Sequence, residues 1–424
     1  MSSTKFTVTK HTFPGQHIRH YAGATRSRDE DMQYLEAKQY TPLGNGKPQA
    51  GDTTIISTCA NGFPKEMYEP LFDELLTFSE RNGVRIRSIW SVDKSDHGAS
   101  GIINERSQGD DPSYFDLARD LLLMINRYRD QMTLPIVGIG HSLGATALLE
   151  LTRIHPRLFS SLILIDPIIG LEVLDLGAML VHVSSRRRDL WQSREEAEGL
   201  FKLSKPLQKW DPRVMKLWLE YGLRDTPTLL YPELGNVTLR TTKATEVWNY
   251  ARSWFDPLPL DGTYVSERSL VKHPDAHRTI VKTHPFYLPE AMEAWRHLPH
   301  VRCSVLYLFP ETGPLSSANA MEEKVARTGN GEGGSGGQRY GRTSKIVVEG
   351  MGHLAPFEKP DQCARAMAEW LAKDIQASSE RTKYERENRD DKSVNKVALS
   401  DEWVRQAKLW FDMNVKKASA KAKL

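Results

Sequence analysis

The segment from Leu134 to His155 constrains the fold of this chain more than any other. Residues 134–139 form an apolar run rich in β-branched side chains, which predicts a buried strand, and residues 145–155 carry apolar side chains at helical spacing. Between them lies Gly140-His141-Ser142-Leu143-Gly144, a Gly-x-Ser-x-Gly pentapeptide. Glycines relieve the crowding of so sharp a strand-to-helix turn, which presents the central serine at the carboxyl edge of a sheet. We therefore predict that Ser142 is a nucleophile.

Two other interpretations of this turn are an ordinary glycine-rich connection and a dinucleotide-binding loop. In the first, the pentapeptide is a structural turn with no catalytic role. The second fails on spacing, because Gly138 and Gly140 need a third glycine where Leu143 stands.

The rest of the chain predicts an α/β fold. Short apolar strands are expected at 53–58, 84–90, 134–139, 161–165, 301–309 and 344–349. Those before residue 166 alternate with helical patterns of about ten to fifteen residues, which indicates a mostly parallel central sheet with helices on both faces. Alternating polar and apolar residues within 6–21 and 32–41 predict an antiparallel pair at one sheet edge.

The alternation of strands and helices stops after Asp166. Helical patterns follow at 194–203, 212–222, 244–255 and 289–297, with no clear strand before residue 301. So long an insertion is not a structureless loop, so we predict a helical cap (167–299) over the active-site edge of a core formed by 1–166 and 300–375. Its tryptophans are expected to pack mainly within the cap and to form an apolar roof: Trp191, Trp210, Trp218, Trp248 and Trp254.

The C-terminal part of the chain has a different composition. Residues 328–341 contain TGNGEGGSGG, which predicts a flexible loop that does not pack. Residues 376–424 are a charged extension, expected to be disordered over 378–392 and to form an amphipathic helix over 401–413. The final tripeptide Ala422-Lys423-Leu424 is a close variant of Ser-Lys-Leu, which predicts recognition by the peroxisomal import receptor and a location in the peroxisomal matrix.

Composition argues against several other classes of protein. A formal charge of +3, from 57 basic and 54 acidic residues, gives no reason to expect nucleic acid as a partner. No run approaches the roughly 18 apolar residues of a transmembrane segment. Three scattered cysteines suit neither a disulfide framework nor a zinc site, and His273, His277 and His284 lack an accompanying carboxylate or cysteine pattern. We expect no metal and no cofactor.

A serine nucleophile needs a base to take its proton and a carboxylate to orient that base. His353 follows the last predicted strand, in Gly350-Met351-Gly352-His353, where a loop can return it to Ser142. Asp166 ends the strand after the nucleophile's helix, and Glu311 follows the next core strand. Either acid gives the order serine, acid, histidine, so both stay open, with Asp166 favoured.

The oxyanion of the reaction needs backbone donors. The N–H of Leu143 at the helix N-terminus and the N–H of Phe63 in the loop after strand 53–58 are the predicted pair. His141 is expected to be a structural neighbour of Ser142 and not the base.

Four segments carry a resemblance to a known family: Ala60–Leu71, Gly138–Gly144, His155–Phe159 with Leu162–Pro167, and Gly350–His353. Over roughly residues 50–375 the chain resembles α/β-hydrolases. More narrowly it resembles the fungal peroxisomal abhydrolases associated with host-selective toxin biosynthesis, with a more distant likeness to the peroxisomal lipase of yeast. The resemblance implies the α/β-hydrolase fold, a nucleophile at Ser142, a base at His353, and an oxyanion hole that includes Phe63 and Leu143.

The chain departs from this family at two places. Many relatives have His-Gly where this chain has Asn61-Gly62, which changes a side chain beside the oxyanion hole. Many also carry the acid after the late strand, at the position where Gly313 stands here. The second departure favours Asp166 over Glu311.

These observations predict a serine hydrolase that cleaves a carboxylic ester or thioester of a hydrophobic acyl group, lipid or polyketide-like, through an acyl-enzyme. The resemblance implies a role in fungal peroxisomal lipid or toxin and other secondary metabolism. An acyl-CoA thioesterase or acyltransferase would use the same residues, and a non-catalytic binding protein on a hydrolase scaffold is a further alternative. An epoxide hydrolase needs an aspartate nucleophile, so Ser142 argues against it.

Overall fold

The computed structural model describes residues 5–45, 47–170, 173–255, 267–276, 285–313, 315, 317–389 and 396–421. His277, His284 and the tripeptide Ala422-Lys423-Leu424 lie outside these residues. The chain divides into two compact units, Met1–Ile375 and Gln376–Leu424. The first unit contains the sheet and the predicted catalytic residues.

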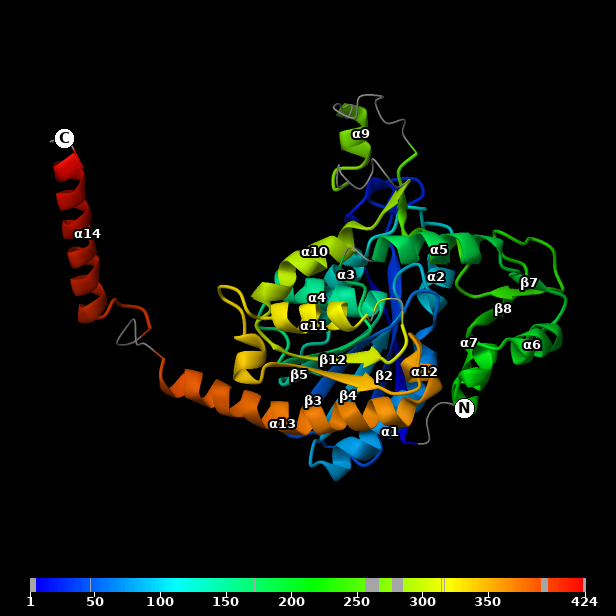
Figure 1. Ribbon diagram of the computed structural model, residues 1–424, viewed down its shortest axis with the longest axis horizontal. Helices are drawn as coiled ribbons and strands as arrows, with labels where there is room; N and C mark the ends of the chain where they lie inside the picture. The colour runs from blue at the N-terminus through cyan, green and yellow to red at the C-terminus, as the bar shows by residue number, and fades with distance from the viewer. Residues whose placement is uncertain are drawn as a thin grey trace. The chain divides into compact units, whose positions relative to one another are not determined.

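An eight-stranded sheet forms the centre of the first unit, in the order β1-β2-β4-β3-β5-β6-β12-β13 (Figure 1). The strands are β1 (Phe6–Pro14), β2 (Tyr34–Pro42), β3 (Thr53–Thr58), β4 (Ile86–Val92), β5 (Ile136–His141), β6 (Ser161–Ile165), β12 (Ser304–Pro310) and β13 (Thr343–Val348). Neighbours from β4 to β13 pair in parallel, whereas β1–β2 and β2–β4 pair antiparallel. The predicted mostly parallel sheet is therefore confirmed.

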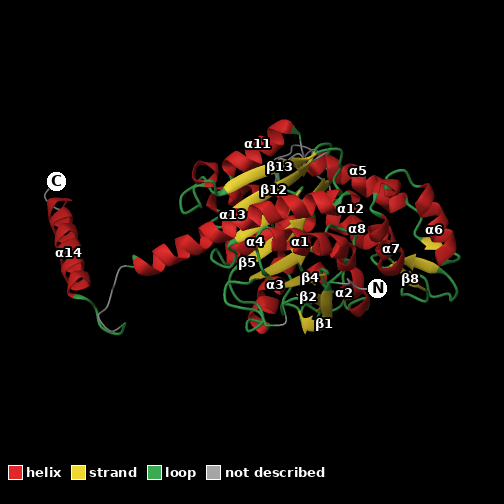
Figure 2. Cartoon of the chain, turned by 90° about the horizontal axis from the view of Figure 1, so that it is seen from below, coloured by secondary structure: helices red, strands yellow, loops and turns green. Residues whose placement is uncertain are grey.

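Helices cover both faces of this sheet (Figures 1 and 2). One hydrophobic cluster buries side chains of α3 (Tyr114–Arg127), α4 (Leu143–Ile154) and α11 (Ala318–Arg327). The other buries side chains of α1 (Glu69–Arg81) and α13 (Pro360–Glu387). Every residue of β3, β5, β6 and β12 is buried, as expected for strands covered on both faces.

Much of the insertion between β6 and β12 lies at the edge toward which the β12 and β13 arrows point (Figure 1), but its last helix packs against α4 on one face of the sheet. Its helices are α5 (Val173–Arg186), α6 (Arg194–Leu203), α7 (Pro212–Tyr221), α8 (Lys243–Tyr250), α9 (Glu267–Lys272) and α10 (Pro289–His297). It also contains a small antiparallel sheet of β7 (Leu190–Trp191), β9 (Val237–Leu239) and β8 (Leu223–Asp225).

A purely helical cap is therefore an incomplete description of this insertion. The helix predicted over 244–255 ends at Tyr250, because β10 (Arg252–Ser253) pairs with β11 (Phe286–Tyr287). Four of the cap tryptophans are buried, namely Trp191, Trp210, Trp218 and Trp254. The remaining one, Trp248, is half-buried and lines a cleft between the cap and the core.

The glycine-rich segment 328–341 packs against the core, contrary to the expectation from its composition. The N–H groups of Gly329, Gly331 and Ser335 donate to the carbonyl oxygens of Leu298, Pro299 and Val301. Within 328–341, glycines 329, 333, 336, 337 and 341 adopt positive φ, which other residues adopt only with strain. The segment thus packs through its backbone and needs no apolar side chains.

Residues 376–387 continue helix α13 to Glu387, so the disorder predicted from residue 378 is wrong for this stretch. Its charged side chains are compatible with an exposed helix as well as with disorder. The amphipathic helix predicted over 401–413 appears as α14 (Asp401–Lys421). Among the helices of the described ranges, none combines the length and the apolar character needed to cross a membrane.

Candidate active site

Ser142 occupies the turn between β5 and α4 with φ 56° and ψ −117°, a strained conformation for a residue other than glycine. The turn is closed by two glycines whose surroundings leave no room for a side chain. A Cβ on Gly140 would lie 2.5 Å from Ala145 Cα, and one on Gly144 would lie 2.7 Å from the Cys59 carbonyl oxygen. The glycines of the pentapeptide are therefore required by close backbone approach.

Three side chains from separate parts of the chain form a continuous hydrogen-bonded row. The His353 ring has Nε2 3.0 Å from Ser142 Oγ and Nδ1 2.6 Å from Asp166 Oδ2. A carboxylate can only accept, so Nδ1 carries the proton and Nε2 is left to accept the serine proton. Asp166 is fully buried, and its N–H donates to Leu308 O in β12 at 2.9 Å, which fixes the carboxylate at the sheet edge.

Glu311, the other candidate acid, lies in a different position. It is exposed, and its Oε2 accepts a 2.7 Å hydrogen bond from the N–H of Gly350. Gly350 has a φ of 71° and opens the loop that carries His353. Glu311 thus braces that loop, whereas Asp166 contacts the imidazole directly.

The two predicted oxyanion donors line the same small cavity of about 10 Å³. Leu143 is the first residue of α4, where an N–H has no acceptor within the helix. The Phe63 N–H donates to Ala60 O over 3.3 Å, which is a long hydrogen bond. To bind an oxyanion, this N–H must either donate to both oxygens or release Ala60 O. Phe63 also packs its ring against Trp210, Trp218 and Phe357.

A buried hydrogen-bond relay joins the oxyanion loop to the loop of His353. Ala60 N–H donates to Tyr68 Oη at 2.9 Å, Tyr68 Oη lies 2.8 Å from His141 Nδ1, and His141 Nε2 lies 2.8 Å from the carbonyl oxygen of His353. That carbonyl can only accept, so Nε2 carries the proton of His141 and Nδ1 accepts the Tyr68 hydroxyl. Burial lowers the pKa of His141 to about 3, which agrees with a neutral ring.

The expectation that His141 neighbours Ser142 without being its base agrees with this geometry. The sequence did not predict its partner Tyr68, and no local motif signals the contact, since 73 positions separate the two residues.

A buried ion network holds the segment after Phe63, and it too was missed from the sequence. Lys65 Nζ lies 2.7 Å from Asp93 Oδ2 and 2.9 Å from Glu36 Oε1, and Asp93 also accepts the Lys65 N–H at 2.8 Å. Burial opposes the ammonium, but the neighbouring carboxylates, Asp93 first among them, raise the pKa of Lys65 above its ordinary value. The sequence signal was a group of charged residues, Lys65, Glu66 and Glu69, among apolar neighbours.

Helix α8 of the cap rests on the oxyanion loop. Asn61 Nδ2 donates to the carbonyl oxygen of Glu246 at 2.8 Å, and a Cβ on Gly62 would lie 3.2 Å from Glu246 Cδ. Asn61 Oδ1 lies 2.8 Å from His97 Nε2, and His97 Nδ1 lies 2.7 Å from Asp96 Oδ1. Asn61 therefore links the cap to the core.

No group of three or more histidine, cysteine or acidic residues within the described ranges could hold a metal ion. His273, one of the three cap histidines noted in the sequence, has Nδ1 3.1 Å from Tyr287 Oη, and its ring packs at a tilt against Trp254. Its role is packing within the cap.

Comparisons with known proteins agree with this architecture. The Alpha/beta hydrolase family model matches residues 59–366. The type I acyl-CoA thioesterase mpaH′ of Penicillium brevicompactum is 37% identical over 429 residues, which is 96% of each chain. The abhydrolase domain-containing protein AFT2-1 of Alternaria alternata is 32% identical over 57% of this chain and 85% of its own.

Among solved structures, the peroxisomal α/β-hydrolase Lpx1 of Saccharomyces cerevisiae superposes with a TM-score of 0.66. The match covers 98% of this chain and 99% of that one, at 14% identity, which supports the fold alone. The predicted resemblance to fungal abhydrolases and to the yeast peroxisomal protein is thus confirmed.

Proposed function

This chain belongs to the alpha/beta hydrolase family, and on that premise we propose that it is a serine thioesterase that hydrolyses an acyl-coenzyme A with a hydrophobic acyl group. The observation that carries the proposal is the hydrogen-bonded row Ser142–His353–Asp166 at a strained nucleophile turn. Such a row supports acyl transfer to and from a serine.

The proposed reaction has two halves. His353 Nε2 takes the proton of Ser142 as Oγ attacks the thioester carbonyl, and the developing oxyanion is held by the N–H of Leu143 and that of Phe63. The C–S bond then breaks, and the thiolate leaves with the proton from His353. In the second half, water gives a proton to His353 as its oxygen attacks the acyl-enzyme carbonyl. The ester bond to Ser142 Oγ then breaks, His353 returns the proton to Oγ, and the carboxylic acid leaves. Asp166 remains ionised and stabilises the imidazolium throughout.

A thioester of coenzyme A is favoured over an oxygen ester by the relative described as a type I acyl-CoA thioesterase, whose match extends over 96% of this chain. An apolar acyl group is favoured by the aromatic side chains beside the oxyanion loop. Phe63, Trp210, Trp218 and Phe357 form one cluster there, with ring centroids 5.0–6.1 Å apart.

The test is labelling of the purified protein with a fluorophosphonate probe, together with kinetics on a panel of acyl-CoA thioesters and matched oxygen esters. Ser142→Ala should abolish labelling and hydrolysis, and Asp166→Asn should lower kcat by about 10⁴-fold, as is typical when the orienting carboxylate is lost. Glu311→Gln is the matched carboxylate control, and we expect it to retain labelling.

Labelling that survives in Ser142→Ala, or a larger loss in Glu311→Gln than in Asp166→Asn, would contradict the assigned roles. Transfer of the acyl group to an added alcohol or amine in preference to water would identify an acyltransferase. A wild-type protein that neither labels nor hydrolyses any member of the panel would point to the binding-protein alternative.

A peroxisomal location and a place in fungal lipid or secondary metabolism are separate proposals. The location rests on the tripeptide Ala422-Lys423-Leu424 of the sequence. A fluorescent protein carrying the last residues of this chain should enter peroxisomes, and deletion of Leu424 should leave it in the cytosol; uptake without Leu424 would refute the assignment.

A further inference from the structure

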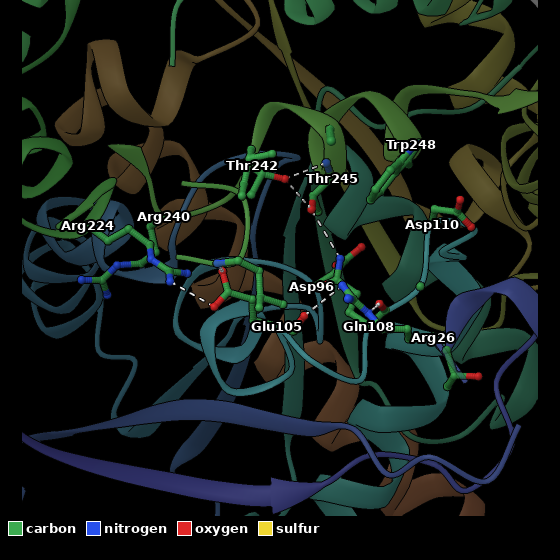
Figure 3. A pocket seen from close by; sticks show the side chains of 16 residues that line it. Arg26, Asp96, Glu105, Gln108, Asp110, Arg224, Arg240, Thr242, Thr245 and Trp248 are labelled. Carbon is green, nitrogen blue, oxygen red and sulfur yellow. Dashed lines mark hydrogen bonds and ion pairs between the residues drawn. The ribbon is translucent and has the colours of Figure 1, made fainter. Parts of the chain in front are cut away.

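A cleft of about 490 Å³ opens between the core and the cap (Figure 3), and Ser142 is not among the residues that line it. The core contributes the segment around Arg26, the loop after β4 and residues 105–110, and the cap contributes β8, the residues after it, and one face of α8. Nothing in the hydrolytic row of Ser142, His353 and Asp166 uses this cleft.

Three arginines reach the cleft, and their partners differ. Arg224 is neutralised by Glu105, 3.1 Å away. Arg26 is exposed and donates to the carbonyl oxygens of Gln108 and Glu105, and Arg240 lies 5.7 Å from the centroid of the Tyr221 ring. Within the described ranges, neither Arg26 nor Arg240 has a carboxylate partner. Two guanidinium groups are thus available to an anionic ligand.

The carboxylates of the cleft do not cancel both of these charges. Asp96 is paired with Lys94 at 2.7 Å, and Glu105 is paired with Arg224. Asp110 is exposed and lines the cleft, and its single negative charge can balance only one of the two guanidinium groups of Arg26 and Arg240. Arginine is the side chain best suited to phosphate, because its planar guanidinium donates in a fork that matches phosphate oxygens.

The cap side of the cleft supplies an aromatic surface and hydroxyl groups. Trp248 is half-buried on α8, and Figure 3 shows it on the same helix as Thr245, which Thr242 caps, across the cleft from Glu105 and Gln108. A half-exposed indole offers a face on which a purine can stack. A flat aromatic face, guanidinium groups and hydroxyls together suit a phosphorylated nucleoside.

The cleft and Ser142 lie along the same edge of the sheet. The strands β4 and β5 both pair with β3, so the turns at their carboxyl ends leave the sheet about 10 Å apart, two strand spacings. Asp96 of the cleft is hydrogen-bonded to His97, which reaches Asn61 in the oxyanion loop. A ligand held in the cleft therefore needs a flexible arm longer than this spacing to reach the nucleophile.

From these observations we propose that this cleft binds the phosphorylated adenosine end of a coenzyme A thioester, while the pantetheine arm delivers the thioester carbonyl to Ser142. The inference rests on the proposed thioesterase function and adds to it the site that recognises the leaving group. Arg26 and Arg240 would hold the phosphates, and Trp248 would stack on the adenine.

The test compares two thioesters of the same acyl group, one of coenzyme A and one of N-acetylcysteamine, which lacks the nucleotide. The measured quantity is the ratio of their kcat/KM values. Arg26→Gln, Arg240→Gln and Trp248→Ala should each lower this ratio about tenfold through a higher KM for the coenzyme A substrate. Arg188→Gln is the matched control, because Arg188 is an exposed cap arginine that pairs with Glu196 away from the cleft.

Calorimetric titration of free coenzyme A into the same proteins gives a second readout that does not depend on catalysis. Binding by the wild type that weakens about tenfold in each cleft variant and persists in Arg188→Gln supports the assignment. An unchanged kinetic ratio, or coenzyme A binding that the cleft variants retain, overturns it. If neither thioester is hydrolysed, the thioesterase proposal fails, and titration alone decides whether the cleft binds coenzyme A.

Discussion

Lowering the pH should destabilise this protein through His141. The ring is fully buried, accepts from the Tyr68 hydroxyl and donates to the His353 carbonyl, so the folded state has no acceptor for a second proton. Burial lowers the pKa of His141 from 6.5 to about 3. Between these two values the unfolded chain binds a proton that the folded chain does not, so the free energy of unfolding rises with pH across this window.

The magnitude follows from the two pKa values. A pH of about 5 lies roughly 1.5 units below the pKa of the unfolded imidazole, which is therefore protonated, while the folded ring stays neutral. The free energy of unfolding is then about 2 kcal/mol lower than at neutral pH. Above about pH 6.5 both states are neutral at this position and the contribution to stability is complete. It is lost progressively as the pH falls toward 3.

The assay is urea unfolding at about pH 7 and about pH 5 for the wild type and His141→Gln, which keeps a donor and an acceptor but cannot be protonated. Other titrating groups are common to both proteins and cancel in the difference. The wild type should lose about 2 kcal/mol more than the variant. Equal losses in the two proteins would refute the reasoning, since they would show that His141 is not the group that resists protonation.

Three further predictions concern the elements that support the site. Gly140→Ala places a Cβ 2.5 Å from the backbone of Ala145, so it should cost about 1–3 kcal/mol in urea unfolding and slow fluorophosphonate labelling; a labelling rate equal to the wild type would contradict this. Lys65→Met leaves Asp93 buried without its ammonium partner and should lower the free energy of unfolding by about 3–5 kcal/mol. A decrease below about 1 kcal/mol would show that the ion network contributes little to stability. Tyr68→Phe should lower the free energy of unfolding by about 2 kcal/mol and should lower kcat by a larger factor than it raises KM. An unchanged kcat would show that the hydrogen-bond relay does not affect catalysis.

The central strands were predictable because burial on both faces leaves continuous apolar runs in the sequence. Strands 53–58 and 161–165 coincide with β3 and β6, and helices 194–203 and 289–297 coincide with α6 and α10. The cap strands were not predictable, because elements of two or three residues carry no periodicity. The packed glycine-rich loop escaped prediction because its partners are backbone groups far away in the chain.

The candidate site was predictable in part. The pentapeptide and the position of His353 after the last strand carry local signals, but two carboxylates satisfied the chain order equally well. Gly313, at the position where many relatives carry the acid, favoured Asp166, and the fold agrees, since it brings Asp166 within 2.6 Å of the imidazole and turns Glu311 toward Gly350. Residues that act through neighbours, such as Tyr68, leave no pattern in the sequence.

The position of Asp166 has an evolutionary consequence. Asp166 is the last residue before the insertion 167–299, and the hydrogen bond from its N–H to Leu308 anchors it to the sheet independently of the inserted residues. A lineage can therefore lengthen, shorten or exchange much of the insertion without displacing the proposed acid Asp166 from the proposed base His353. Gene duplicates that keep the proposed catalytic row could thus acquire a different cap, and with it a different preference for the acyl group, through changes in one contiguous stretch of coding sequence.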